Sequence, residues 1–199
     1  MEPSSPNDSK RRTTGIGGLD YALEGGFPTG TSIVAFGSPI SGLDLMARQF
    51  WKTEDEQGTY LMIDAPVVTE MVDVKETPLP GLSDLMKKDR IVVDSLSSLV
   101  LNHGIDAAVK FMTADTREIR ERGSNILFVF YAHLHSPVEE MRIIRAADVF
   151  IELRQTVHGN EVERSLAIHK IKGSAVPERL VPFIITEKGL ELSTTSRVV

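Results

Sequence analysis

The sequence predicts an α/β fold, a three-layer sandwich in which a mainly parallel, twisted sheet lies between helices and antiparallel strands follow near the C-terminus. Two observations predict this class. From Gly15 to about residue 153, short apolar runs alternate with helical patterns, which is the order of elements in a parallel sheet covered on both faces. After residue 163, strand patterns follow one another without a helix between them, which indicates hairpins at one edge of the sheet.

The apolar runs give the expected elements in chain order. Parallel strands are expected at Thr31 to Phe36, Tyr60 to Ile63, Ile91 to Val93, Ile126 to Tyr131 and Val149 to Leu153. The fourth run is apolar on both faces, so we expect it in the centre of the sheet. Helices are expected at Leu43 to Glu56, Ile105 to Arg122 and Val138 to Ala147. The antiparallel strands are expected at Glu163 to Lys172, Leu180 to Ile185 and Leu190 to Leu192.

The first fourteen residues differ from the rest in composition. Residues 1–14 are rich in proline, serine and charge, and they hold no aliphatic side chain after the initiator methionine. We therefore expect a flexible N-terminal tail. Arg11 and Arg12 in it could contact an acidic partner, although a solvated tail is the simpler interpretation. Residues 15–199 are expected to form a single domain, which suits a chain of 199 residues.

Composition excludes several classes of protein. The 28 acidic and 22 basic residues give a net charge of −6, which argues against a general nucleic-acid binder. With no cysteine in the sequence, disulfide frameworks, thiolate zinc sites and cysteine nucleophiles are excluded. The longest apolar run, Ile126 to Ala132, is too short to span a membrane. A cytoplasmic protein is the resulting expectation.

The segment between the first core strand and its helix has the layout of a phosphate-binding loop. Two glycines five positions apart form a turn between strand and helix, as in G-x-x-x-x-G-K-[ST]. That motif needs a lysine to reach the β- and γ-phosphates and a hydroxyl to hold Mg²⁺, and Leu43 and Asp44 stand at these positions. Asp44 suits a helix N-terminus but would repel a triphosphate. The candidate residues of this degenerate nucleotide site are Gly37, Ser38, Pro39, Ile40, Ser41, Gly42, Leu43 and Asp44.

This loop lies within a longer segment that resembles a known protein family. Thr13 to Phe50 resembles the opening of the KaiC/RadA branch of the RecA-like ATPases, with its G-x-x-G-L-D segment, its L-x-G-G-[IF]-P-x-G turn and a degenerate Walker A loop. Four later segments resemble further parts of that family in the same order: Ile91 to Leu99 (its Walker B strand), Ala146 to Leu153, Ile168 to Ser174 and Phe183 to Leu192. Because archaea are rich in KaiC-like proteins, we also expect an archaeal source.

The resemblance implies a RecA-like core that binds ATP at a subunit boundary of a ring. Asp94 matches the Walker B aspartate that orients Mg²⁺, although it could also simply close its strand. The catalytic glutamate pair of KaiC falls at Asp64-Ala65, where one shorter carboxylate remains. Lys170 and Lys172 match a K-x-R pair that reaches into a neighbour's site.

Three further features depart from the family or leave alternatives open. His133 stands where the family often has a polar γ-phosphate sensor, and Ile40 replaces a usual glycine. His133 and His135 would share a face on a strand, but without a third ligand nearby in the sequence we expect no metal site. Only 25 residues separate Asp64 from Arg90, so one helical element is expected to be missing, with Thr77 to Gly81 as a tight shortcut.

These observations favour a pseudo-ATPase with no catalytic residue and no metal. It would act through protein contacts, as a regulator or scaffold, on an active RecA/KaiC-like relative or as a homo-oligomer. Phosphoryl transfer depends on positioning and charge stabilisation, and the lysine, the hydroxyl and the glutamate pair are all missing. The alternative is an ATP-binding protein or weak ATPase, in which ATP and Mg²⁺ bind at a subunit interface and a neighbour's Lys170 or Lys172 replaces the lost lysine. A nucleic-acid recombinase is disfavoured by the acidic charge.

Overall fold

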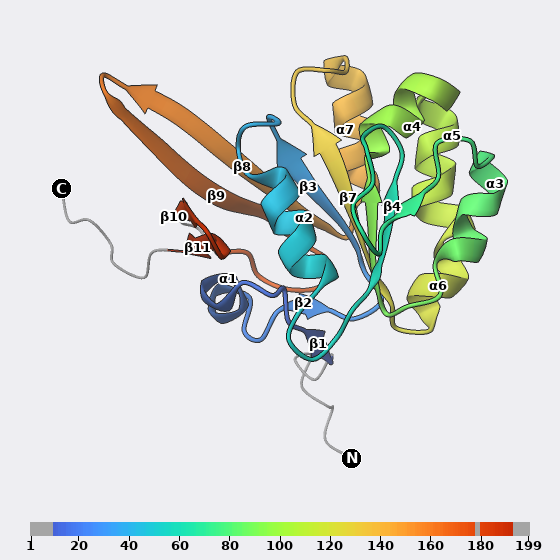
Figure 1. Ribbon diagram of the computed structural model, residues 1–199, viewed down its shortest axis with the longest axis horizontal. Helices are drawn as coiled ribbons and strands as arrows, with labels where there is room; N and C mark the ends of the chain where they lie inside the picture. Colours follow the sequence, from blue (N-terminus) through green and yellow to red (C-terminus); the bar gives the residue numbers. More distant parts are fainter. Residues whose placement is uncertain (1–9, 178–179, 193–199) are drawn as a thin grey trace.

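The computed structural model describes residues 10–177 and 180–192. Within these residues, a nine-stranded sheet has the order β11-β10-β9-β8-β3-β7-β6-β4-β5, and β1 and β2 form a separate small sheet. Figure 1 shows helices on both sides of the main sheet and a long hairpin, β8–β9, that extends beyond the body. The three-layer α/β architecture expected from the sequence is confirmed.

The elements have the following bounds. The strands are β1 (Arg11–Arg12), β2 (Phe27–Pro28), β3 (Ser32–Gly37), β4 (Thr59–Met62), β5 (Val72–Asp73), β6 (Arg90–Asp94), β7 (Asn125–Tyr131), β8 (Val149–His158), β9 (Glu161–Ile171), β10 (Val181–Thr186) and β11 (Gly189–Leu192). The helices are α1 (Gly17–Ala22), α2 (Leu43–Trp51), α3 (Leu79–Leu82), α4 (Leu96–His103), α5 (Ile105–Lys110), α6 (Arg117–Glu121) and α7 (Pro137–Ala146). In the described ranges, every helix is shorter or more polar than a membrane span.

Strand β3 lies in the middle of the sheet. Val34 is aligned with Phe128 of β7 on one side and with Phe150 of β8 on the other, and both pairings are parallel. Strands β4, β6 and β7 continue the parallel part, whereas β8, β9, β10 and β11 pair antiparallel in that order. The expected division into parallel core strands and antiparallel C-terminal additions is confirmed.

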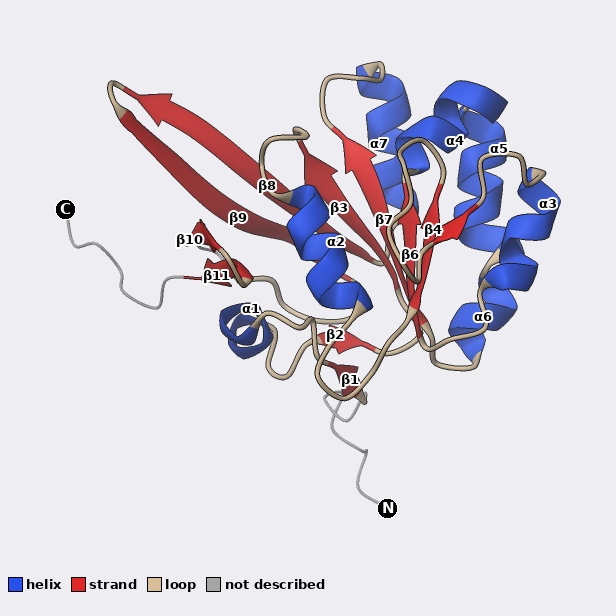
Figure 2. Cartoon of the chain, in the orientation of Figure 1, coloured by secondary structure: helices blue, strands red, loops and turns tan. Residues whose placement is uncertain are grey.

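Alternate residues of the core strands supply two separate apolar clusters. One cluster combines side chains such as Val92 and Val129 with the buried face of α2, and the other combines Val93 and Phe128 with α4, α5 and α7. Figure 2 shows this division, with α1 and α2 on one side of the sheet and α3 to α7 on the other. A strand buried on both faces is apolar at every position, which is why these strands read as continuous apolar runs.

Several expected boundaries are wrong. The helix expected from Ile105 to Arg122 is divided by a π-turn at Phe111–Asp115, where the Thr116 N–H reaches back five residues to Phe111 O. The Thr113 and Thr116 hydroxyls also donate to carbonyls four residues back, a contact that competes with regular helix. Helix α2 ends at Trp51 rather than Glu56, because the carbonyl of Trp51 accepts a bond from the Gly58 N–H.

The other corrections concern the connections. The segment from Thr77 to Gly81 is no bare shortcut, because it leads into α3 and a 3-10 turn at Ser83–Leu85. Strand β5 had no counterpart among the expected elements. Strands β8 and β9 are longer than the predicted runs and are joined by Gly159 and Asn160, a two-residue connection typical of tight hairpins.

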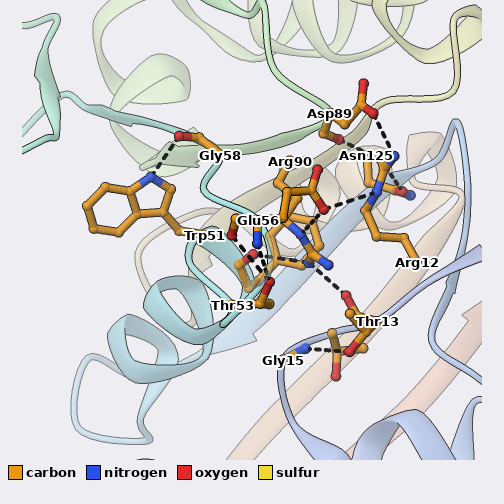
Figure 3. Close-up of polar contacts among 12 residues, drawn as sticks. Arg12, Thr13, Gly15, Trp51, Thr53, Glu56, Gly58, Asp89, Arg90 and Asn125 are labelled. Carbon is orange, nitrogen blue, oxygen red and sulfur yellow. Dashed lines mark hydrogen bonds and ion pairs between the residues drawn. The ribbon is translucent and has the colours of Figure 1, made fainter.

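The N-terminal segment is part of the fold from residue 10, so the expectation of a tail reaching Thr14 is wrong for its last residues. Strand β1 pairs with β2, and Thr14 is buried. The Arg12 guanidinium donates to the carbonyl of Asp89 at 2.7 Å and to Asn125 Oδ1 at 3.1 Å. These bonds, drawn in Figure 3, attach the segment to the N-terminal edge of the sheet. Residues 1–9 of the predicted tail lie outside the described residues.

Arg90 is the central group of this polar network. Its side chain is 2% exposed. Its Nε donates to Glu56 Oε2 at 2.6 Å, and its Nη1 donates to the carbonyls of Thr13 at 2.7 Å and Phe50 at 3.3 Å. Figure 3 shows the guanidinium between Glu56 and Thr13. One buried cation therefore joins the N-terminal segment, the end of α2 and the start of β6.

We predict that Arg90→Met lowers the free energy of unfolding by about 3 kcal/mol, because it leaves buried carbonyls without a donor and Glu56 without its cation. Amide hydrogen exchange in residues 10–14 should also become faster. Denaturant unfolding and exchange mass spectrometry measure the two effects. Arg117→Met on the exposed face of α6 is the control and should change stability by less than about 0.5 kcal/mol. Equal stability losses in the two variants would contradict the assigned role of Arg90.

Candidate functional site

The candidate site lies where the parallel strands end. Strands β3, β7, β6 and β4 are neighbours and run in the same direction, so the loops after them meet at one edge of the sheet. Figure 1 shows these loops together at the upper end of the molecule, with the first turn of α7 beside them. In open α/β sheets, this edge is where ligands bind. The residues from Gly37 to Asp44 and Asp94 all lie at this edge.

The loop of Ser38 to Gly42 is folded back on itself. The N–H and the hydroxyl of Ser41 both donate to the carbonyl of Ser38, at 3.0 and 2.7 Å. Pro39 has no N–H, and Ile40 is 69% exposed at the tip of the turn. Pro39 and Ser41 therefore offer no free backbone N–H to an anion, whereas a phosphate-binding loop presents its N–H groups to the ligand.

Both glycines of the loop are required by their surroundings. Gly42 has φ 96°, and a Cβ there would lie 3.0 Å from Leu190 Cδ2. A Cβ at Gly37 would lie 2.6 Å from the carbonyl oxygen of Leu153 and equally close to Ser41 Oγ. The spacing of the two glycines thus matches the close packing of this turn against β8 and β11, and it does not require a bound phosphate.

The two residues after the loop differ sharply in environment. Leu43, at the position of the motif lysine, is 1% exposed and belongs to the apolar cluster beneath α2. Asp44 is exposed in the first turn of α2, where a carboxylate is favoured by the helix dipole. The position that should carry a cation is therefore part of the core, and the next position carries an anion.

Asp94 is the last residue of β6 and accepts hydrogen bonds from two tyrosines. The Tyr60 hydroxyl donates to Asp94 Oδ2 at 2.6 Å, and the Tyr131 hydroxyl donates to Oδ1 at 3.4 Å. The register explains this contact: Tyr60 is aligned with Val92, two residues before Asp94, so the two side chains leave the sheet on the same face. Trp51 supports Tyr60, with its ring centroid 5.3 Å away.

Burial and neighbouring charge make this an unfavourable place for a carboxylate. Burial raises the pKa of Asp94, the bond from Tyr60 lowers it again in part, and the nearby charges of Asp64 and Asp44 raise it further. Burial also raises the pKa of Tyr131, and Asp94, Asp64 and Asp44 all add to that increase. The edge thus combines three carboxylates with two tyrosine hydroxyls that stay protonated.

Asp64, the remaining member of the broken acidic pair, is held by serines. The Ser95 hydroxyl donates to Asp64 Oδ2 at 2.8 Å, and the Ser98 hydroxyl donates to the same oxygen. Ser95 is also the N-cap of α4 and accepts a bond from the Ser98 N–H. The carboxylate of Asp64 therefore stabilises the start of α4. This is a structural role, and it does not require that Asp64 is a remnant of a catalytic pair.

The two lysines expected to reach a neighbouring subunit are bonded within their own chain. Lys170 Nζ donates to the carbonyl of Arg145 at 2.9 Å, at the C-terminal end of α7. Lys172 Nζ lies 3.1 Å from Asp148 Oδ1. A cation is favoured at a helix C-terminus and beside a buried carboxylate. The positive charge of each lysine is therefore explained by contacts within its own chain.

The two histidines after β7 do not lie on a strand. His133 and His135 lie in the loop after β7, and His133 has φ 64°, so they share no strand face. His135 stacks on Phe130 with ring centroids 4.8 Å apart, and burial lowers its pKa. Across residues 10–177 and 180–192, no three His, Asp or Glu side chains are placed to hold a metal ion.

Tyr60 and Tyr131 are the site residues that the sequence analysis missed. Each lies on a strand next to β6. Because side chains alternate between the two faces of a strand, the register places both tyrosines on the same face of the sheet as Asp94. The sequence does show one tyrosine on each of these two apolar strands. Predicting that both contact Asp94 would have required the order of the strands in the sheet and their register.

A mainly parallel sheet with helices on both faces and a glycine turn between its central strand and the next helix defines the chain as a RecA-like α/β protein. A family model described as "ATPase: KaiC" matches residues 76–197, more than half of the chain. The chain belongs to this family, as the segments compared in the sequence analysis indicated.

Individual relatives agree with this assignment. A UPF0273 protein of Pyrococcus horikoshii is 24% identical to this chain over 92% of the chain and 93% of its own length. The circadian clock oscillator protein KaiC of Thermosynechococcus vestitus is 22% identical over 99% of this chain, which covers 45% of that relative. A solved KaiC-like protein of Pyrococcus horikoshii matches with a TM-score of 0.74 at 20% identity, covering 93% of this chain and 99% of its own. A further UPF0273 relative comes from Thermotoga maritima, and the archaeal source stays a prediction.

Two buried aspartates should respond to pH in opposite directions. The raised pKa of Asp94 means that its ionisation costs stability as pH rises through that value, so Asp94→Asn should melt above the wild type at pH 7 and equal it near pH 4. For Asp148, burial alone would raise the pKa, but bonds from Ser32 and Lys172 outweigh it and lower the pKa. Asp148→Asn should therefore lose about 2 kcal/mol at pH 7, and less as pH falls towards 3.

Thermal unfolding of both variants from pH 3 to pH 8 measures these effects. Each variant is the control for the other, because both replace one buried aspartate by its neutral isostere. A destabilised Asp94→Asn at pH 7 would show that this carboxylate is needed in its charged form.

Proposed function

We propose that this chain is a non-catalytic member of the KaiC family, a pseudo-ATPase that acts through protein contacts made at the sheet edge. The observation that carries the proposal is the burial of Leu43, 1% exposed, at the position where the loop needs a lysine for the β- and γ-phosphates. A regulatory or scaffolding role beside an active KaiC-like relative, or in an oligomer of this chain, fits this chemistry.

The residues of the edge fit Mg-ATP poorly. Both oxygens of Asp94 already accept tyrosine hydroxyls, and the Asp64 oxygen nearest α4 already accepts two serine hydroxyls. No hydroxyl stands at position 44 to hold Mg²⁺. The acid pair that would activate water is reduced to Asp64. These residues argue against phosphoryl transfer at this edge.

Charge opposes nucleotide binding as well. Burial raises the pKa of Tyr131, and the charges of Asp94, Asp64 and Asp44 raise it further. Asp44 and Asp64 are exposed at this end of the sheet. At an effective dielectric constant of about 20, a phosphate charge about 4 Å from one carboxylate would be disfavoured by about 4 kcal/mol. Such a penalty corresponds to a nearly thousandfold loss of affinity.

The alternative, an ATP-binding protein or weak ATPase with a site at a subunit interface, is favoured by the family assignment itself. It needs a cation from a neighbouring subunit to replace the missing lysine. Lys170 and Lys172, the residues expected to supply it, are bonded to the end of α7 and to Asp148. Each would have to break an internal contact to reach another subunit, which is why we rank this alternative second.

We predict no measurable Mg-ATP hydrolysis and no calorimetric signal for ATP or ADP with Mg²⁺. Calorimetric titration and a phosphate-release assay on rigorously purified protein test this. Asp94→Asn distinguishes intrinsic turnover from contamination, because a contaminating ATPase would persist in the variant. Hydrolysis that disappears in Asp94→Asn would refute the proposal and support the alternative.

A repaired loop should regain nucleotide binding. Leu43→Lys with Asp44→Thr restores the cation and the hydroxyl, and adding Ile40→Gly frees the tip of the turn; we expect micromolar ATP affinity without hydrolysis. Removing a buried leucine should also lower the free energy of unfolding by about 2 kcal/mol.

Leu43→Met with Asp44→Thr is the matched control for the repair, because it introduces no cation and should bind no nucleotide. Calorimetry and thermal unfolding compare the variants. A folded triple variant without affinity for ATP or ADP would place the defect in the closed Ser38 to Ser41 turn rather than in its charge.

A further inference from the structure

The edge that carries the candidate site is also apolar at its surface. Exposed aliphatic side chains stand in the loops after three parallel strands of the sheet, β3, β7 and β4, and in the first turn of α7: Ile40, Val67, Val68, Leu134 and Val138. Ile40 and Val138 are 69% and 70% exposed. Single exposed aliphatic residues are ordinary, but five along one edge indicate a surface that another molecule covers.

Topology places these residues together. Ile40 follows β3, Leu134 and Val138 follow β7, and Val67 and Val68 follow β4, and all three strands run in parallel within one sheet. Figure 1 shows the three loops at the same end of the molecule as the start of α7. We call this surface, formed by Ile40, Val67, Val68, Leu134 and Val138, the apolar edge.

The charge around the apolar edge is negative. Asp44 and Asp64 are exposed beside it, and Glu139 and Glu140 lie in the first turn of α7. The Glu139 carboxylate is partly engaged, since it accepts bonds from the Ser136 N–H and hydroxyl. Burial and the Asp94 carboxylate raise the pKa of Tyr60, and the positive charge of Arg48 on α2 lowers it by a smaller amount. A covering molecule therefore needs both aliphatic groups and positive charge.

We propose that the apolar edge is a docking surface for a basic, amphipathic segment of a partner protein, with lysine or arginine side chains directed to Asp44 and Asp64. This inference rests on the proposed function, because Mg-ATP would compete for the same edge. It adds the chemistry of the partner: aliphatic side chains cover Ile40 and Val138, and cations neutralise the carboxylates left without a motif lysine.

A second copy of this chain suits the edge less well. Edge-to-edge contact of two copies would bring Asp44 and Asp64 of one copy against the same carboxylates of the other, which is a repulsive arrangement. Many of the basic side chains that a copy could offer are already engaged in internal ion pairs or carbonyl bonds: Arg12, Arg90, Arg120, Arg142, Arg154, Lys170 and Lys172. The negative charge at the apolar edge therefore favours a different, basic polypeptide as the molecule that covers it.

Fluorescence anisotropy with three labelled peptides of about fifteen residues tests the proposal. The probe carries lysine and leucine at helical spacing; one comparison peptide replaces leucine by serine, and the other replaces lysine by glutamate. Saturable binding is expected for the lysine–leucine peptide alone. Affinity should fall at least about tenfold for Ile40→Ser/Val138→Ser and for Asp44→Asn/Asp64→Asn.

Two controls separate this surface from general stickiness. Tyr21→Ser removes an exposed aromatic residue from α1, and Asp84→Asn/Glu121→Gln removes two negative charges away from the edge. Each should change the peptide affinity by less than about twofold. Equal losses in edge and control variants, or equal binding of the lysine–serine peptide, would overturn the proposal.

Sedimentation of the wild type and of Ile40→Ser/Val138→Ser tests the other occupant. An oligomer that dissociates in this variant would assign the edge to a second copy and overturn the proposal, whereas unchanged sedimentation supports it. Calorimetry with Mg-ATP keeps the two hypotheses apart. Absence of both peptide and nucleotide binding would sink the docking surface alone, whereas Mg-ATP that binds and displaces the peptide would sink the proposed function while supporting the surface.

Discussion

The parallel register of β4, β6 and β7 decides what the candidate site contains. It brings Tyr60, Asp94 and Tyr131 to one face of the sheet, so that the aspartate at the end of β6 meets hydroxyl groups from both neighbouring strands. A shift of any one strand by a single residue would turn its side chains to the opposite face and leave Asp94 buried without these donors. The polar chemistry of the edge is thus a consequence of backbone pairing.

The lower end of the same sheet is held by a different kind of interaction. Arg90 and Arg12 connect the N-terminal segment to the beginnings of β6 and β7 through buried or half-buried hydrogen bonds. Buried cations of this kind are retained only with a full set of acceptors. Because this network is far from the strand ends that form the candidate site, substitutions at the upper edge can change its chemistry while the sheet stays anchored.

The sequence predicted the positions of the core strands along the chain well, because strands buried on both faces are apolar at every position and are hard to confuse with surface segments. It failed where the outcome depended on pairing. The bonds of Arg12 to Asp89 and Asn125 join residues far apart in the chain, so composition alone indicated a solvated tail. The tyrosines around Asp94 were missed for the same reason. Position 43 was identified as lacking a cation, but its burial in the core could be seen only in the fold.

The comparison of Asp94 with the aspartate of an active site shows how one residue can keep its position and change its chemistry. A carboxylate that orients Mg²⁺ must be ionised and have a free oxygen. Here burial favours the protonated form and the tyrosines occupy both oxygens, while Asp44 and Asp64 add negative charge that no lysine balances. On the proposed function, an edge with this balance favours cations over phosphates. Asp44 and Asp64 are exposed and have no lysine at position 43 beside them. The physical reason to look for a basic partner is therefore the same as the reason to doubt a nucleotide.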